Sequence, residues 1–118
     1  MMLSNNFSRA EFECQCGQCD YDTVDAELII VLQSLRDYIG KPITITSGNR
    51  CPEHNVNIGG TKNSYHVKGR AADIQVKGVS ASVIQSYLDE TYPDEYGIGF
   101  YSTFTHIDTR TNKGRWYG

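Results

Sequence analysis

A regular spacing of apolar residues over positions 24–39 constrains the fold of this chain most strongly. Apolar side chains recur there at intervals of three and four, at Leu28, Val31, Leu32, Leu35 and Ile39. This spacing is typical of an amphipathic helix with one buried face. Gly40 is suited to end the helix, and Pro42 leads into the β-branched run 43–46, which predicts a strand. The sequence therefore predicts a helix that must be covered by a sheet.

The rest of the chain continues the mixture of strands and helices. Strands are predicted over 71–76, 96–101 and 104–108, and a second helix over 80–92 with Val83, Ile84, Tyr87 and Leu88 on one face. Ser8 and Glu11 have the spacing of a capping box, which predicts a short helical turn. Residues 47–63 are rich in Ser, Gly, Asn and Pro and are expected to form a loop. We expect an α+β fold, a small and mainly antiparallel sheet with flanking helices.

Length and charge limit the organisation and the partners of the chain. With 118 residues and no linker or repeat, we expect a single domain over 1–118. A net charge of -3 leaves no basic block for phosphates, so we expect no nucleic-acid partner. No apolar run approaches the roughly 18 residues of a membrane span, and the start lacks a secretory signal peptide pattern.

Three of the four cysteines are concentrated near the start of the chain. Cys14, Cys16 and Cys19 form a C-x-C-x-x-C cluster, and Cys51 is distant. A structural zinc site, one or two disulfides, and free thiols in a tight loop all remain open.

Two histidines lie in patterns that suit a metal site. His66 precedes Asp73 by seven residues, and His106 lies within a predicted strand. Two imidazoles and one carboxylate are ligands that zinc accepts while keeping a fourth position open for water. Alternation along 104–108 would put His106 and Asp108 on one face and Ile107 on the other. Spacing alone fits ordinary surface histidines about as well.

A family resemblance appears at these residues. The segment SYHVKGRAAD resembles the S-x-H-x-x-G-x-A-x-D signature of the zinc D-Ala-D-Ala carboxypeptidase family. ITSGNRCPEHN is similar to the stretch that precedes this signature, with Asn49 where an aromatic residue is usual. FTHIDTR resembles the closing strand, and FSRAEFECQCGQC resembles the start of the short, single-domain members. The match extends from about Phe7 to Arg110, and three motifs in order are more specific than any one.

The resemblance implies roles for individual residues. The zinc ligands would be His66, Asp73 and His106. Arg50 would bind the substrate carboxylate or stabilise the oxyanion, as a guanidinium can. Ser64 would donate a hydrogen bond to substrate or organise its loop.

The catalytic base is where the chain departs from the family pattern. Thr103 stands where several relatives carry an acid. Asp108 is therefore expected to act as general base or to orient a ligand imidazole. His54 is the remaining polar candidate for the base, and the alternative is that it is an ordinary solvent-exposed histidine in a loop.

The resemblance also implies a hedgehog/DD-peptidase-like fold and an activity. We expect zinc-dependent hydrolysis of peptide bonds in peptidoglycan stem peptides or cross-links. The alternatives are a non-catalytic zinc-containing cell-wall-binding module, or an interaction module built on a cysteine zinc site. We expect a monomer, and a phage- or prophage-encoded lysis enzyme released by lysis or carried on the virion; a host enzyme that remodels the wall is the alternative. Trp116 and Tyr117 could line a substrate groove, although packing is their commoner role.

Overall fold

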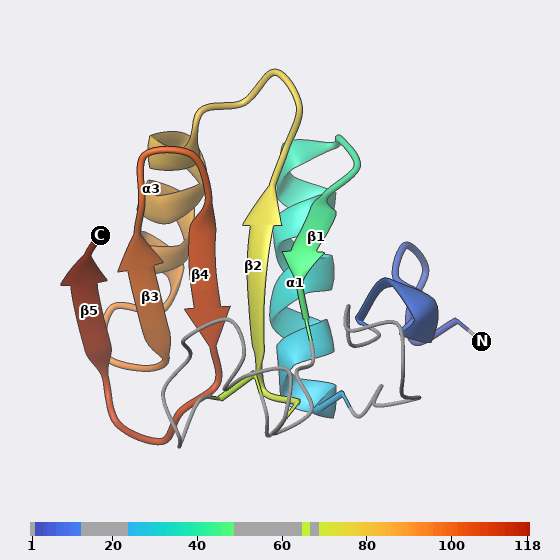
Figure 1. Cartoon of the computed structure of the whole chain (residues 1–118), viewed down its shortest axis with the longest axis horizontal. Coiled ribbons are helices and arrows are strands. Elements are labelled where there is room, and N and C mark those ends of the chain that lie inside the picture. Colours follow the sequence, from blue (N-terminus) through green and yellow to red (C-terminus); the bar gives the residue numbers. More distant parts are fainter. Residues whose placement is uncertain (1, 13–23, 49–64, 67–68) are drawn as a thin grey trace, which may run out of the picture.

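In the part of the chain that the structure describes, one sheet carries two helices on the same face. A computed structural model describes residues 2–12, 24–48, 65–66 and 69–118. Helices α1 (Ala26–Ile39) and α3 (Ala81–Thr91) lie behind the sheet in Figure 1, which leaves the other face of the sheet for the site described below. A short 3-10 helix, η1 (Arg9–Phe12), lies beside strand β1. The expected α+β class is confirmed.

Within the described residues the sheet has five strands, and all neighbouring pairs but one are antiparallel. The strands are β1 (Thr44–Ser47), β2 (Ala71–Gln75), β3 (Gly97–Phe100), β4 (Thr105–Asp108) and β5 (Gly114–Tyr117). Their order across the sheet is β1-β2-β4-β3-β5, and only β3 and β5 run parallel among these described strands. β2 and β4 are therefore adjacent inner strands, and each is paired with a neighbouring strand on both sides.

Helix α1 follows the predicted pattern of apolar residues. Leu28, Val31, Leu32 and Leu35 are all buried. Gly40 ends the helix in the left-handed conformation, with φ 70°, and its N–H donates to the carbonyl of Arg36 at 2.9 Å. A glycine adopts this conformation without the steric strain of a Cβ. The prediction of this helix and of its end is confirmed.

The core lies between the helices and the inner face of the sheet. The strands contribute Ala72, Ile74, Ile98 and Ile107, and the helices contribute their leucines together with Ile84. Alternation along a strand sends neighbouring side chains to opposite faces. Because Ile74 and Ile107 point into the core, Asp73 and His106 lie on the opposite face.

The structure differs from the sequence prediction in two places. Strand β5 was not predicted; it pairs with β3 from Gly97↔Gly114 to Phe100↔Tyr117. Val83 was predicted on the buried face of α3, but it is 49% exposed. Gln85 is buried instead, because its amide donates to the carbonyls of Tyr101 and Phe104 at 2.9 and 3.4 Å.

The turn predicted at the start of the chain is confirmed. The backbone N–H of Ser8 donates to Glu11 Oε2 at 2.6 Å, and the hydroxyl of Ser8 reaches the same oxygen at 3.3 Å. Among the described residues, no helix combines the length and apolar character that crossing a membrane requires.

Candidate metal centre

Two central strands and the segment before β2 bring three potential metal ligands together. Asp73 on β2 stands directly opposite His106 on β4 in the antiparallel register. His66 approaches from the segment that precedes β2. In the described part of the chain, one ligand atom from each of these residues lies within 4.8 Å of the other two. The expected neighbourhood of His106 and Asp73 is confirmed.

The backbone around His66 fixes its imidazole. The Nδ1–H donates to the carbonyl oxygen of Gly48 at 2.6 Å, and the residue is only 3% exposed. This assigns the lone pair of the neutral ring to Nε2, which lies 3.3 Å from Asp73 Oδ1. Gly69, with φ 70°, turns the chain between His66 and β2, and its N–H donates to the His66 carbonyl at 3.3 Å. The expected bend at Gly69 is present.

Gly48 has to be a glycine for this contact to form. A Cβ at this position would lie 2.8 Å from the backbone Cα of Phe12. That distance is below normal van der Waals contact, and backbone atoms yield less readily than the end of a side chain. The close packing of Gly48 on the backbone of Phe12 therefore places the Gly48 carbonyl where it can accept the hydrogen bond from His66.

His106 is held between two carboxylates. Its Nδ1 lies 2.9 Å from Asp73 Oδ1, and its Nε2 lies 2.7 Å from Asp108 Oδ2. The ring also packs against Trp116, with 5.1 Å between centroids, and meets the ring of His66 edge-on at 5.2 Å. Nδ1 therefore points to the candidate metal position, and Nε2 points away from it.

The charges of the centre stabilise one another. Burial alone would raise the pKa of Asp73, but the hydrogen bond from His106 and the proximity of His66 outweigh it and hold this pKa well below its usual range. Burial would lower the pKa of His106, whereas the hydrogen bonds to Asp108 and Asp73 raise it. The centre thus holds an ionised carboxylate beside an imidazole that binds a proton readily, and a cation could replace that proton.

The donor set suits zinc. Two imidazole nitrogens and one carboxylate oxygen are a ligand combination of catalytic zinc sites, where a fourth position takes water or substrate. The other ring nitrogen of each histidine donates its N–H to an oxygen. His66 donates to the carbonyl of Gly48, and His106 donates to the carboxylate of Asp108. Such partners orient ligand imidazoles in metal sites. The residues present therefore fit the metal.

Asp108 lies behind the candidate ligands. Its side chain is fully buried, and both of its oxygens accept hydrogen bonds from the guanidinium of Arg110. Burial would raise the pKa of Asp108, but the hydrogen bonds from Arg110 and His106 hold it well below its usual range. Thr103 is exposed, and its carbonyl accepts a hydrogen bond from Gln75 Nε2 at 2.9 Å.

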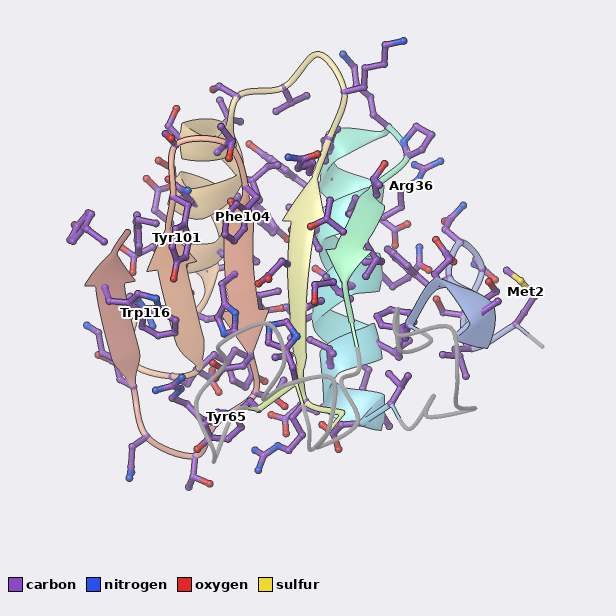
Figure 2. All side chains as sticks on the ribbon, in the orientation of Figure 1. Met2, Arg36, Tyr65, Tyr101, Phe104 and Trp116 are labelled. Carbon is purple, nitrogen blue, oxygen red and sulfur yellow. The ribbon has the colours of Figure 1, made fainter. Side chains whose placement is uncertain are left out.

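An aromatic cluster beside the centre was not anticipated in this arrangement. Tyr101, Phe104 and Trp116 lie over the β3–β4–β5 part of the sheet (Figure 2). The rings of Tyr101 and Phe104 stack at 4.3 Å, and Trp116 Nε1–H donates to the Tyr101 hydroxyl at 3.0 Å. Trp116 packs on His106, whereas Tyr117 is 82% exposed. The β3–β5 pairing that brings Trp116 to the centre leaves no local signal in the sequence.

Several predicted site residues lie outside the described residues. They are Arg50, Ser64, His54 and the four cysteines, Cys14, Cys16, Cys19 and Cys51. Their predicted roles stay predictions.

Comparison with known proteins identifies the family. The sequence model of the family described as Peptidase M15 matches residues 5–108. Peptidoglycan L,D-endopeptidase MepK of Escherichia coli (strain K12) is 33% identical over 96 residues, which cover 74% of this chain and 52% of that protein. Zinc D-Ala-D-Ala carboxypeptidase of Streptomyces albus G is 31% identical over an alignment of 122 residues, covering 95% of this chain and 48% of that protein.

The extent of these matches supports the family resemblance found in the sequence. The chain spans about half the length of the curated relatives it matches. The family match, by contrast, covers most of the chain, including His66, Asp73 and His106. The chain belongs to the peptidase M15 family.

Proposed function

We propose that this chain is a zinc-dependent peptidase that hydrolyses peptide bonds in the stem peptides or cross-links of peptidoglycan. The observation that carries the proposal is the convergence of His66, Asp73 and His106 at one point of the sheet. Two relatives add support, because one is named a peptidoglycan L,D-endopeptidase and the other a zinc D-Ala-D-Ala carboxypeptidase. Their names differ in the bond that is cut, so both endopeptidase and carboxypeptidase action belong to the proposal.

In this proposal, His66 Nε2, Asp73 and His106 Nδ1 would hold the metal. Zinc in such a site supplies a Lewis acid that polarises a carbonyl and lowers the pKa of water to about 7. The chain contributes the orientation of the ligands. Gly48 fixes one imidazole through its carbonyl, and Asp108 fixes the other through its carboxylate.

For Asp108 the geometry favours the orienting role over that of general base. A general base must lie within hydrogen-bond reach of the attacking water. Asp108 instead contacts the ring nitrogen of His106 that faces away from the candidate metal position, and both of its oxygens accept from Arg110. An Asp108→Asn variant separates the two roles. If Asp108 orients His106, the variant binds zinc more weakly; if Asp108 is the general base, the variant turns over more slowly even at full zinc occupancy.

The remaining roles stay as the sequence suggested them. Arg50 would bind the substrate carboxylate or stabilise the oxyanion, and Ser64 would contact substrate or organise its loop. If Asp108 orients His106, the proton acceptor has to come from another group, and His54 and Glu53 are candidates in the segment 49–64. Substituting each in turn and measuring turnover at saturating zinc tests them.

The proposal is tested by digesting purified peptidoglycan with the zinc-loaded protein and reading the products by mass spectrometry. The expected result is a set of shortened stem peptides or opened cross-links that is absent with a His106→Ala variant. The mass of the products identifies the bond that is cut. Intact peptidoglycan after incubation with folded protein that holds about one zinc per chain would contradict the proposal.

One observation favours a second candidate, a non-catalytic zinc-containing module that binds the cell wall. Position 103, where several relatives carry an acid, is a threonine here. Both oxygens of Asp108 already accept hydrogen bonds from Arg110. Such a module would sediment with peptidoglycan and leave it uncut. Whether Cys14, Cys16, Cys19 and Cys51 hold a structural zinc, form disulfides or stay free thiols is still open, and the monomeric state and the phage lysis role stay predictions.

A further inference from the structure

Arg110 stands one contact further from the candidate metal than Asp108 does. Its guanidinium donates two hydrogen bonds to the Asp108 carboxylate, one from Nε to Oδ1 at 2.8 Å and one from Nη2 to Oδ2 at 2.7 Å. We call this bidentate contact the fork. The backbone N–H of Arg110 adds a third hydrogen bond to Oδ1 at 3.1 Å. Oδ2 is also the acceptor for His106 Nε2. The plane and the position of the Asp108 carboxylate are therefore set mainly by Arg110.

Two aromatic rings hold the guanidinium of Arg110 in turn. Its central carbon lies 4.8 Å from the ring centroid of Tyr65 and 4.8 Å from that of Trp116. Tyr65 immediately precedes His66, and Trp116 packs on His106. A planar guanidinium can stack on rings and still form a bidentate fork, which the ammonium of a lysine cannot do.

The sheet leaves room for this pair at a glycine. Gly97 on β3 pairs with Asp108 on β4. A Cβ at Gly97 would lie 2.4 Å from Arg110 Nε and 2.4 Å from Asp108 Oδ1. Any other residue would push into the fork itself. The absence of a side chain on β3 is thus a condition for the contact between Arg110 and Asp108.

We propose that Arg110 is a positioning residue of the metal centre, which acts through Asp108 to keep His106 Nδ1 turned toward the metal. This inference rests on the metal ligands of the proposed function and extends them by one residue. Without the fork, the Asp108 carboxylate can rotate away from Nε2, and the His106 ring loses the acceptor that sets its orientation. The measurable consequence is weaker metal binding.

The test measures zinc affinity by competition with a chromogenic chelator, after subtracting the zinc retained by a His106→Ala blank. Arg110→Met is expected to raise the zinc Kd about tenfold or more, within the 10- to 100-fold range of residues that support metal ligands. Arg110→Lys keeps the charge without the fork and is expected to restore only part of the affinity. The visible spectrum of the cobalt-loaded protein should change in the same order, because it reports the ligand geometry.

A double-substitution cycle separates action through Asp108 from independent action. If Arg110 acts through Asp108, then adding Arg110→Met to Asp108→Ala leaves the zinc Kd of the single Asp108→Ala variant unchanged. Arg115→Met is the matched control. Arg115 Nε donates to Asp89 Oδ1 at 2.7 Å, and its other guanidinium nitrogens donate to backbone carbonyls on the helix side of the sheet. This control is expected to lower thermal stability and to leave the zinc Kd unchanged.

Three results would overturn the inference. An Arg110→Met protein with the wild-type zinc Kd but impaired peptide cleavage would make Arg110 a substrate contact. Losses that multiply in the double variant would make the two residues independent. A fall in zinc affinity as large for Arg115→Met would make the effect general destabilisation.

Folding failure and failure of the proposed function are both distinguishable from failure of this inference. Should Arg110→Met not fold, Gly97→Ala perturbs the same fork and is expected to weaken zinc binding; an unchanged Kd there contradicts the inference. Wild-type protein that binds zinc at the His106-dependent site but cleaves no peptidoglycan would contradict the proposed function alone.

Discussion

Zinc should stabilise this fold strongly, and the effect should depend on His106. The ligand groups come from β2, from β4 and from the segment before β2, so they meet only in the folded chain. A metal that binds the folded state in preference to the unfolded state raises the free energy of unfolding. The perturbation is to strip the protein with a chelator and then add zinc back under reducing conditions.

The size of the effect follows from the length of the chain. At free zinc about 100 times the Kd, one site contributes about 2.7 kcal/mol. For a chain of 118 residues, an unfolding entropy near 2.1 cal/mol/K per residue makes about 1 kcal/mol equivalent to about 4 °C. The expected rise in Tm is therefore about 11 °C. This is an upper value, because any zinc that the four cysteines bind in the unfolded chain reduces the difference.

Thermal unfolding followed by circular dichroism measures this shift in the wild type and in a His106→Ala variant. The variant should keep the fold and lose most of the shift. A shift of equal size in both proteins would refute the reasoning, because the zinc would then be bound elsewhere, such as at the cysteines. A wild type whose Tm does not respond to zinc would refute it as well.

Three further predictions concern the sheet and the charges of the centre. Ile107→Ala, at a fully buried position between His106 and Asp108 on β4, should lower the free energy of unfolding by about 2–5 kcal/mol in urea titrations, whereas Val83→Ala at an exposed position should change it by less than about 0.5 kcal/mol. Gly99→Ala should cost about 1–3 kcal/mol by the same assay, since the new Cβ would lie 2.7 Å from the nearest aromatic side-chain atom; a neutral effect would contradict the packing. In the metal-free protein, the raised pKa of His106 contributes stability that is fully present below pH 6.5, the ordinary pKa of histidine, and is lost as the pH rises through the raised value. The lowered pKa of Asp73 contributes stability that is present above pH 3.8, the ordinary pKa of aspartate, and is lost as the pH falls through the lowered value. The metal-free protein should therefore be most stable between about pH 4 and 6.5, and His106→Ala should flatten the alkaline side of that profile.

Local patterns in the sequence predicted most of the elements of the fold. Apolar periodicity and Gly40 identified α1 with its end, because a helix buries one face and needs a residue that tolerates positive φ at its terminus. Strand β5 escaped prediction. Its sequence GRWY is short and mixed, and its parallel pairing with β3 depends on a distant segment rather than on local alternation.

The wrong placement of Val83 has a related cause. Periodicity assigns apolar residues to the buried face of a helix, but it does not register polar groups that find partners inside. Gln85 is buried because two carbonyls of the β3–β4 connection accept its amide protons. A buried amide with its hydrogen bonds satisfied is stable in an apolar setting, so it occupied the face that Val83 was expected to share.

The candidate ligands and one of their supports, Asp108, were predictable, whereas the supporting roles of Gly48 and Arg110 were not. His66, Asp73 and His106 lie in motifs that the family resemblance identifies, and strand alternation correctly placed Asp108 beside His106. The carbonyl of Gly48 and the fork of Arg110 depend on backbone approach and on sheet pairing. His66 and Gly48 are separated by 18 residues, and the fork of Arg110 on the nearby Asp108 needs the space that Gly97 leaves on the neighbouring strand, so no local pattern encodes either contact.

The central claim is tested most directly by titrating zinc into stripped protein and following hydrolysis of a purified muropeptide. We predict that the rate rises with added zinc up to about one equivalent per chain and then levels off, and that His106→Ala stays inactive throughout. Hydrolysis that needs no zinc, or that survives in the His106→Ala variant, would contradict the account.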